Sequence, residues 1–148
     1  MTNLQASQLY YVIEGDDSPS VVDEAHPLPV TIAETGYDTR FENALVGTVL
    51  NVKPGAGRLF GVYVTNGGTV TNWVQFFDMP ASEVVLGTTP PKFSLGVPKG
   101  VSATDTGAMD TWWKDGVKFN RAISYAATTT PTGSTTAAVG QTINTFFK

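Results

Sequence analysis

The chain has 148 residues, a low charged fraction of 15%, a net charge of −4 and no cysteine. This length fits one domain that buries roughly two thirds of its unfolded surface, and the absence of cysteine excludes disulfides and cysteine-ligated metals and favours folding inside a cell. No run approaches the roughly 20 apolar residues of a membrane span, and no basic region followed by an apolar core opens the chain, so we expect neither a membrane protein nor a secreted one.

Charge is divided unevenly along the chain. Residues 1–42 carry eight acidic side chains and one basic one, a net of −7, whereas residues 43–148 carry five acidic and eight basic ones, a net of +3. The acidic segment can lie against its own mildly basic body or a neighbouring copy, although an ordinary solvated arm explains the asymmetry equally well. Lys and Arg form no cluster in the sequence, so nucleic-acid binding is not expected.

The first 47 residues are predicted to form an extended acidic arm. Residues 9–13 are a short apolar run that predicts a first strand. In residues 21–30, Pro27 and Pro29 exclude a helix and a central strand, which leaves an extended segment or an edge strand. Because prolines leave little conformational entropy to be lost on docking, such an arm is suited to lying along another surface.

A hairpin is predicted at the centre of the chain. Residues 35–45 allow at most a short helical turn, and residues 47–53 predict a strand. Residues 58–66 and 70–78 are rich in aromatic and β-branched residues, and the Asn-Gly-Gly sequence at 66–68 supplies the positive φ angles of a tight turn. Both strands carry large apolar groups on both faces, which indicates a central position in a sheet.

Short strands and turns continue to the end of the chain. Further strands are predicted at residues 92–97, 117–119, 122–126 and 142–147, and loops at residues 79–91, 101–110 and 128–139. Short strands separated by frequent turns, without a convincing amphipathic helix, predict an all-β antiparallel β-sandwich of the jelly-roll type. We expect two parts, the arm at residues 1–47, which can contribute an edge strand, and the sandwich body at residues 48–148.

Signals for catalysis or metal binding are weak. His26 is the only histidine and directly precedes Pro27, so a structural or solvated role is expected. The four carboxylates between residues 16 and 24 lack the alternating ligands and fixed glycine of a calcium loop. Asp105 and Asp110 could form an acid–base pair for glycoside cleavage, which needs a cleft and a defined separation that the sequence does not indicate. We expect no enzyme, no cofactor and no metal.

The adjacent pair Trp112–Trp113 is the most distinctive local feature. In a strand the two rings face opposite sides, so one is expected in the core and the other outside. An outward tryptophan is either a subunit contact or a carbohydrate platform, and we favour the contact.

Several short segments resemble a known family. Residues 22–30, Val-Asp-Glu-Ala-His-Pro-Leu-Pro-Val, resemble a phrase seen near the amino terminus of small virion proteins of tailed bacteriophages, and residues 57–66, 73–78, 86–90 and 122–128 are similar to later phrases of such proteins. The resemblance implies a jelly-roll or sandwich domain that decorates or cements the capsid, commonly as a trimer, or that builds head fibres and tail parts. The pair Trp112–Trp113 departs from the family pattern.

The expected function is therefore that of a non-enzymatic virion protein, a decoration or cement protein that binds the outer capsid surface and stabilises junctions between capsomers. The expected partners are the major capsid protein and further copies of the chain in a homotrimer, at the capsid surface, after synthesis in the bacterial cytoplasm. The alternative is a head-fibre or tail-associated domain that binds a host-surface glycan. The residues expected to contact the capsid or a neighbouring subunit are Val22, His26, Pro27, Leu28, Pro29, Val30, Trp112 and Trp113.

Overall fold

The chain divides into two compact units, Met1–Thr35 and Gly36–Lys148. The computed structural model describes residues 10–11, 20–21, 36–101, 105–138 and 140–148. In the first unit, β1 (Tyr10–Tyr11) and β2 (Ser20–Val21) form a short antiparallel pair, so the strand expected near residue 10 is present. The proline-containing segment at residues 22–30 lies outside the described residues.

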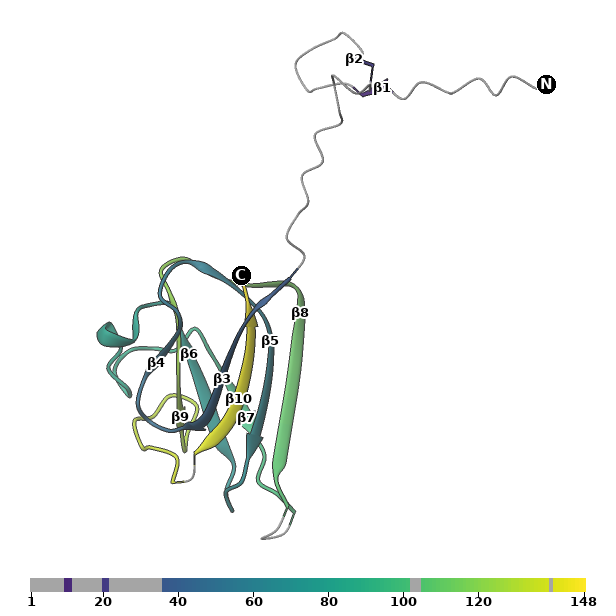
Figure 1. Cartoon of the computed structure of the whole chain (residues 1–148). Helices are drawn as coiled ribbons and strands as arrows, with labels where there is room; N and C mark the ends of the chain where they lie inside the picture. The colour runs from purple at the N-terminus through teal and green to yellow at the C-terminus, as the bar shows by residue number, and fades with distance from the viewer. Residues whose placement is uncertain (1–9, 12–19, 22–35, 102–104, 139) are drawn as a thin grey trace, which may run out of the picture. The chain divides into compact units, whose positions relative to one another are not determined.

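The described residues of the second unit form two four-stranded antiparallel sheets (Figure 1). The strands are β3 (Asp38–Leu45), β4 (Leu50–Lys53), β5 (Gly57–Asn66), β6 (Asn72–Phe77), β7 (Phe93–Val97), β8 (Gly107–Phe119), β9 (Ile123–Thr128) and β10 (Gln141–Phe147). The first sheet has the order β3-β10-β5-β8, and the second sheet has the order β4-β9-β6-β7. The predicted fold class, an all-β antiparallel sandwich, is confirmed.

The hydrophobic core lies between the two sheets. Along β10, Ile143, Thr145 and Phe147 are buried while the residues between them are only half-buried, which is the period of two that a strand imposes. Ile143 and Phe147 therefore share the core face of the strand. The buried apolar side chains of the core are Leu45, Val52, Leu59, Val62, Val64, Val74, Phe76, Val97, Phe119, Ile123, Tyr125, Ala127, Ala137, Ile143 and Phe147. Full burial of a large apolar side chain contributes about 1.5–3 kcal/mol.

The predicted hairpin at residues 58–78 was wrong. Both of its strands form, but β5 pairs with β10 and β8 in the first sheet, whereas β6 pairs with β9 and β7 in the second. Neither Gly67 nor Gly68 adopts a positive φ angle. Instead, the buried Asn66 side chain accepts a hydrogen bond from the Gly68 N–H at 2.9 Å and donates one to the Val70 carbonyl at 2.9 Å. These side-chain bonds shape a connection that crosses from one sheet to the other.

The prediction of at most a helical turn at residues 35–45 was also wrong, because this segment forms the edge strand β3, which pairs with β10. Its inner side carries Arg40, whose Nε donates to the buried Tyr125 hydroxyl at 3.3 Å, while Phe41 on its outer side is exposed. A cation facing inward and a ring facing outward invert the usual apolar pattern of a strand. The sequence of β3 therefore gives no strand signal. Since β3 belongs to the sandwich, the border between the units falls after Thr35 rather than near residue 47.

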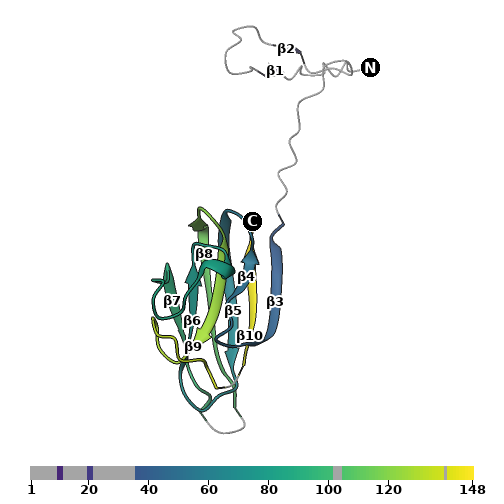
Figure 2. The ribbon, with the colours of Figure 1, turned by 90° about the vertical axis from the view of Figure 1, so that its left-hand side faces the viewer.

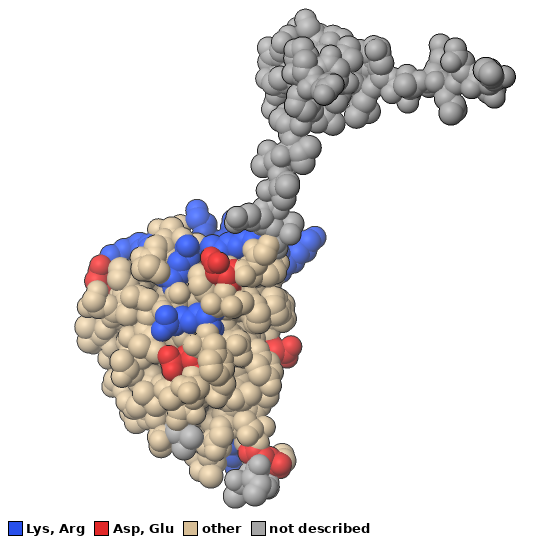
Figure 3. Space-filling view, viewed as in Figure 1, with Lys and Arg blue, Asp and Glu red and all other residues tan. Residues whose placement is uncertain are grey.

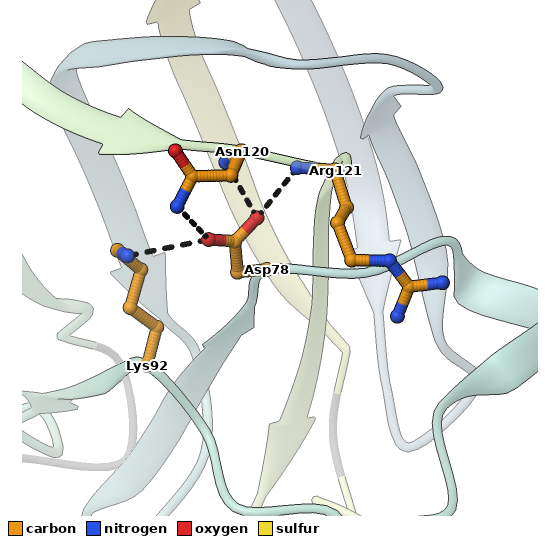
Figure 4. Close-up of polar contacts among 4 residues, drawn as sticks. All are labelled: Asp78, Lys92, Asn120 and Arg121. Atoms are coloured by element: carbon orange, nitrogen blue, oxygen red, sulfur yellow. Dashed lines mark hydrogen bonds and ion pairs between the residues drawn. The ribbon is translucent and has the colours of Figure 1, made fainter.

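Asp78, directly after β6, joins three segments of the second unit (Figure 4). Its carboxylate accepts hydrogen bonds from the backbone N–H groups of Asn120 at 2.7 Å and Arg121 at 2.9 Å, and Lys92 Nζ lies 3.4 Å away. Partial burial by itself raises the pKa of Asp78, but the two backbone N–H groups and the Lys92 ammonium together outweigh it, and the pKa is lowered. The ionised carboxylate therefore holds the β8–β9 turn and the β6–β7 loop against the end of β6.

We predict that Asp78→Asn lowers the free energy of unfolding by about 1–2 kcal/mol near neutral pH, because charge-assisted hydrogen bonds are lost. Since the pKa of Asp78 in the folded state lies below its ordinary value of 3.8, the stabilisation is present above that pH and disappears as the pH falls through the folded-state pKa. Urea unfolding of both proteins between about pH 3 and 7 measures this.

Glu83→Gln is the matched control for the Asp78 variant. It removes a carboxylate that is paired with Arg121 while both side chains are half exposed, and such pairs contribute at most about 1 kcal/mol. An equal loss in the two variants, or a loss in Asp78→Asn that does not change with pH, would contradict the assignment.

Candidate functional site

The outer face of the second sheet is covered by the chain itself (Figure 2). Gln75 Nε2 donates to the Gly133 carbonyl at 2.9 Å, in the loop between β9 and β10, and Ser124 Oγ donates to the Met79 carbonyl at 2.8 Å, at the start of the loop between β6 and β7. Every residue of β9 is buried, so both faces of this strand are covered. The second sheet therefore offers little surface to a ligand.

The outer face of the first sheet instead presents aromatic rings to solvent. Tyr37, Phe41, Tyr63 and Trp112 are 48%, 59%, 44% and 55% exposed, respectively. The other exposed large apolar side chains of the described chain are three valines outside the strands. Within residues 36–148, as far as their exposure is described, exposed aromatic rings are confined to one face of one sheet, and a patch of this kind marks a binding surface.

The strand register brings the rings into rows across the sheet. Asn144 of β10 lies opposite Phe41 on one side and Tyr63 on the other, and Tyr63 lies opposite Asp110 of β8. Residues that lie directly opposite each other point to the same face of a sheet. This row therefore alternates a ring, an amide, a second ring and a carboxylate.

A second row is centred on Trp112. Phe146 of β10 lies opposite Gly61 of β5, and Gly61 lies opposite Trp112 of β8. A Cβ atom on Gly61 would stand only 2.6 Å from the Trp112 indole, so the indole lies flat against the backbone there. Its centroid is 4.7 Å from that of Phe146 and 6.4 Å from that of Tyr37. The indole therefore packs on the Gly61 backbone and beside the rings of Phe146 and Tyr37, and its other face is exposed to solvent.

An irregularity in β5 adds one more ring to this face. The register of β5 shifts between Leu59 and Gly61 against β8, and the register against β10 shifts at the same place. Leu59 stays in the core, while Phe60 contacts the Tyr37 ring with centroids 4.9 Å apart. On β8 the shift is accompanied by Gly116, whose φ is +65°, so the strand contains a bulge there.

We call this surface the open face. It consists of Tyr37, Thr39, Phe41, Phe60, Gly61, Tyr63, Thr65, Ala108, Asp110, Trp112, Thr142, Asn144 and Phe146. Asp110 is the single charged residue in this set, and the set holds no Leu, Ile, Val or Met. Lys148 Nζ lies 5.4 Å from the Tyr37 ring at one end of the open face. Lys and Arg gather at the same end of the body, where β3 begins (Figure 3).

The tryptophan pair divides as predicted. Trp112 faces outward, and Trp113 packs against the core with its ring 5.5 Å from that of Phe93. Of the residues expected to contact a partner, Trp112 alone is on the open face. The others in the arm, Val22, His26, Pro27, Leu28, Pro29 and Val30, lie outside the described residues, as do the four carboxylates between residues 16 and 24.

The other rings of the open face were not predicted as site residues. The available signal was a second aromatic pair, Phe146–Phe147, which in a strand must also place one ring outward. Phe41 and Tyr37 carried no such signal, because β3 itself was not predicted.

Asp110 lies within the open face, and Asp105 precedes β8, so nothing in the strand register pairs the two carboxylates. Within the described ranges, His, Cys, Asp and Glu form no group of three that could hold a metal ion. The same residues contain no helix long and apolar enough to cross a membrane. No protein-family model, curated protein or solved structure matches the chain.

We predict that Gly61→Ala displaces the Trp112 indole, because the new methyl group would overlap it. The free energy of unfolding should fall by about 1–3 kcal/mol, the usual cost of overpacking. The tryptophan emission spectrum should also change, because the indole moves relative to solvent. Gly67→Ala is the control, since a Cβ there meets nothing within 4 Å and its φ is not positive. Equal stability and emission in the two variants would contradict the close packing of Trp112 on Gly61.

Proposed function

We propose that this chain is a non-enzymatic structural protein of a virion, a decoration or cement protein bound to the outer surface of a bacteriophage capsid. The strand order supports the proposal, because we interpret sheets ordered β3-β10-β5-β8 and β4-β9-β6-β7 as a jelly roll, a fold used by viral capsid and lectin domains. The short segments that resemble small phage virion proteins support the same class. Fold alone does not define function, so the proposal depends on a binding test.

The division of the chain into units supports a separation of roles. The core among the described residues is built from residues between Leu45 and Phe147, and Gly36–Lys148 is a compact unit. Residues 1–35 contain six acidic residues, no Lys or Arg, and three prolines. We propose that the segment from Ser18 to Val30 contacts the major capsid protein or a neighbouring copy, while the sandwich projects from the shell.

The mechanism of such a protein is mechanical. Each copy would cover a junction between capsomers, and the buried area would favour the assembled shell by mass action. The proposed assembly is a homotrimer, which in solution would have a mass of about 47 kDa, three times the 15.7 kDa of one chain. Synthesis in the cytoplasm of a bacterial host and attachment to the capsid surface belong to the same proposal.

Co-sedimentation with capsids stripped of accessory proteins tests the proposal. The full chain should pellet with the shells at a saturable stoichiometry, and light scattering should give the mass of a trimer. A variant that lacks residues 1–35 should keep its unfolding temperature, because Gly36–Lys148 is a compact unit with a core of its own, and should lose the binding.

Val85→Ala is the control for the truncation, because Val85 is an exposed loop residue away from the open face. This variant should sediment with the shells as the full chain does. Failure of the full chain to pellet with shells would overturn the virion proposal. Unchanged binding of the truncated chain would overturn the role of the arm alone.

A further inference from the structure

We propose that the open face is a carbohydrate-binding site for neutral oligosaccharides, a function separate from attachment to a capsid. The site comprises the exposed rings of Tyr37, Phe41, Tyr63 and Trp112 with the polar side chains between them. The sandwich itself holds the site, so the inference does not depend on the proposed virion role.

The rings suit the apolar side of a sugar. The C–H groups on one side of a pyranose carry partial positive charge, and the face of an aromatic ring is negative. Trp112 offers such a face, because its indole lies flat on Gly61 and is flanked by Phe146 at 4.7 Å. A ring whose position is fixed before binding loses little entropy when a sugar stacks on it.

The polar residues suit the edge of a sugar. Asn144 lies between Phe41 and Tyr63 in the register, and Asp110 lies beside Tyr63. An amide both donates and accepts, and a carboxylate accepts from two donors, which matches neighbouring hydroxyl groups. Rings and hydrogen-bonding groups therefore alternate across the sheet, as the apolar faces and hydroxyl edges of a sugar chain do.

Charge favours a neutral ligand. Asp110 is the one charged residue among the rings of the open face. The cations on the same side of the sheet stand beyond Trp112 and Phe60 or beside Tyr37, and they are Arg58, Lys114, Lys118 and Lys148. A sulfated or phosphorylated chain would meet the Asp110 carboxylate without a cation at the centre of the face, which is unfavourable. An uncharged sugar chain has no such cost.

The size of the face argues against a second copy as the occupant. Four strands spaced about 4.8 Å apart and about 20 Å of strand length give roughly 400 Å². Two such faces together have a flat footprint of about 800 Å², which is small beside the roughly 1,200–2,000 Å² of accessible surface that stable protein interfaces bury. An oligosaccharide of a few sugar units needs no larger area.

An array of neutral and acidic oligosaccharides, followed by affinity electrophoresis of the full chain in gels containing neutral polysaccharides, tests the proposal. The full chain should bind at least one neutral glycan and should be retarded by the matching polysaccharide. Trp112→Ala should lower the affinity at least about tenfold, the loss expected for a central aromatic contact. Phe41→Ala, an edge-strand change with no ring contact to its neighbours in the described chain, tests the same face if Trp112→Ala does not fold.

Val85 is exposed in the loop between β6 and β7 of the second sheet, outside the open face. The variant Val85→Ala should therefore bind as the full chain does. Circular dichroism and the unfolding temperature establish that each variant is folded. Three results would overturn the proposal: no glycan bound by the full chain, binding unchanged in folded Trp112→Ala and Phe41→Ala, or a dimer in solution that those changes dissociate. The last result would assign the open face to a second copy. Because no capsids are used, these outcomes are independent of the co-sedimentation result.

Discussion

The insertion of β10 between β3 and β5 is the constraint on which the rest of the second unit depends. The last strand of the chain pairs on both sides, and it places Ile143 and Phe147 in the core and Asn144 and Phe146 on the open face. At its end, the backbone of Lys148 both donates to and accepts from that of Arg58. The first sheet is therefore complete only when the final residues have docked, and folding must wait for contacts between distant parts of the chain.

The two sheets differ in what covers their outer faces. Loops from the chain itself lie over the second sheet, where the carbonyls of Gly133 and Met79 accept hydrogen bonds from Gln75 and Ser124. Every residue of β9 and all but one of β6 are buried there. The first sheet receives the core on one side only, and its other side carries aromatic rings. Leaving rings exposed costs hydrophobic free energy, and their concentration on one face is most simply explained by a ligand.

The positions of the rings on the open face are fixed by contacts with the backbone of the sheet and with neighbouring rings. Gly61 allows the Trp112 indole to approach the backbone, and the bulge at Gly116 accompanies the shift that turns Phe60 outward toward Tyr37. Each ring is therefore placed by strands that the core holds rigid. A site built in this way is preorganised, which is the property that weak, repeated contacts to a sugar chain require.

Local sequence was sufficient to determine that the described residues form an all-β structure with strands near residues 50, 95, 125 and 145. It also determined that one ring of Trp112–Trp113 packs against the core, because period-two alternation is a property of each strand alone. It did not determine the partners of β5 and β6, the strand β3, or which rings share the open face. Sheet neighbours here come from distant segments, Asn66 replaces the expected glycine turn by side-chain bonds, and the shift at Phe60 breaks the alternation. Only tertiary structure decides such features, because hydrogen bonds between distant strands outweigh the preferences of neighbouring residues.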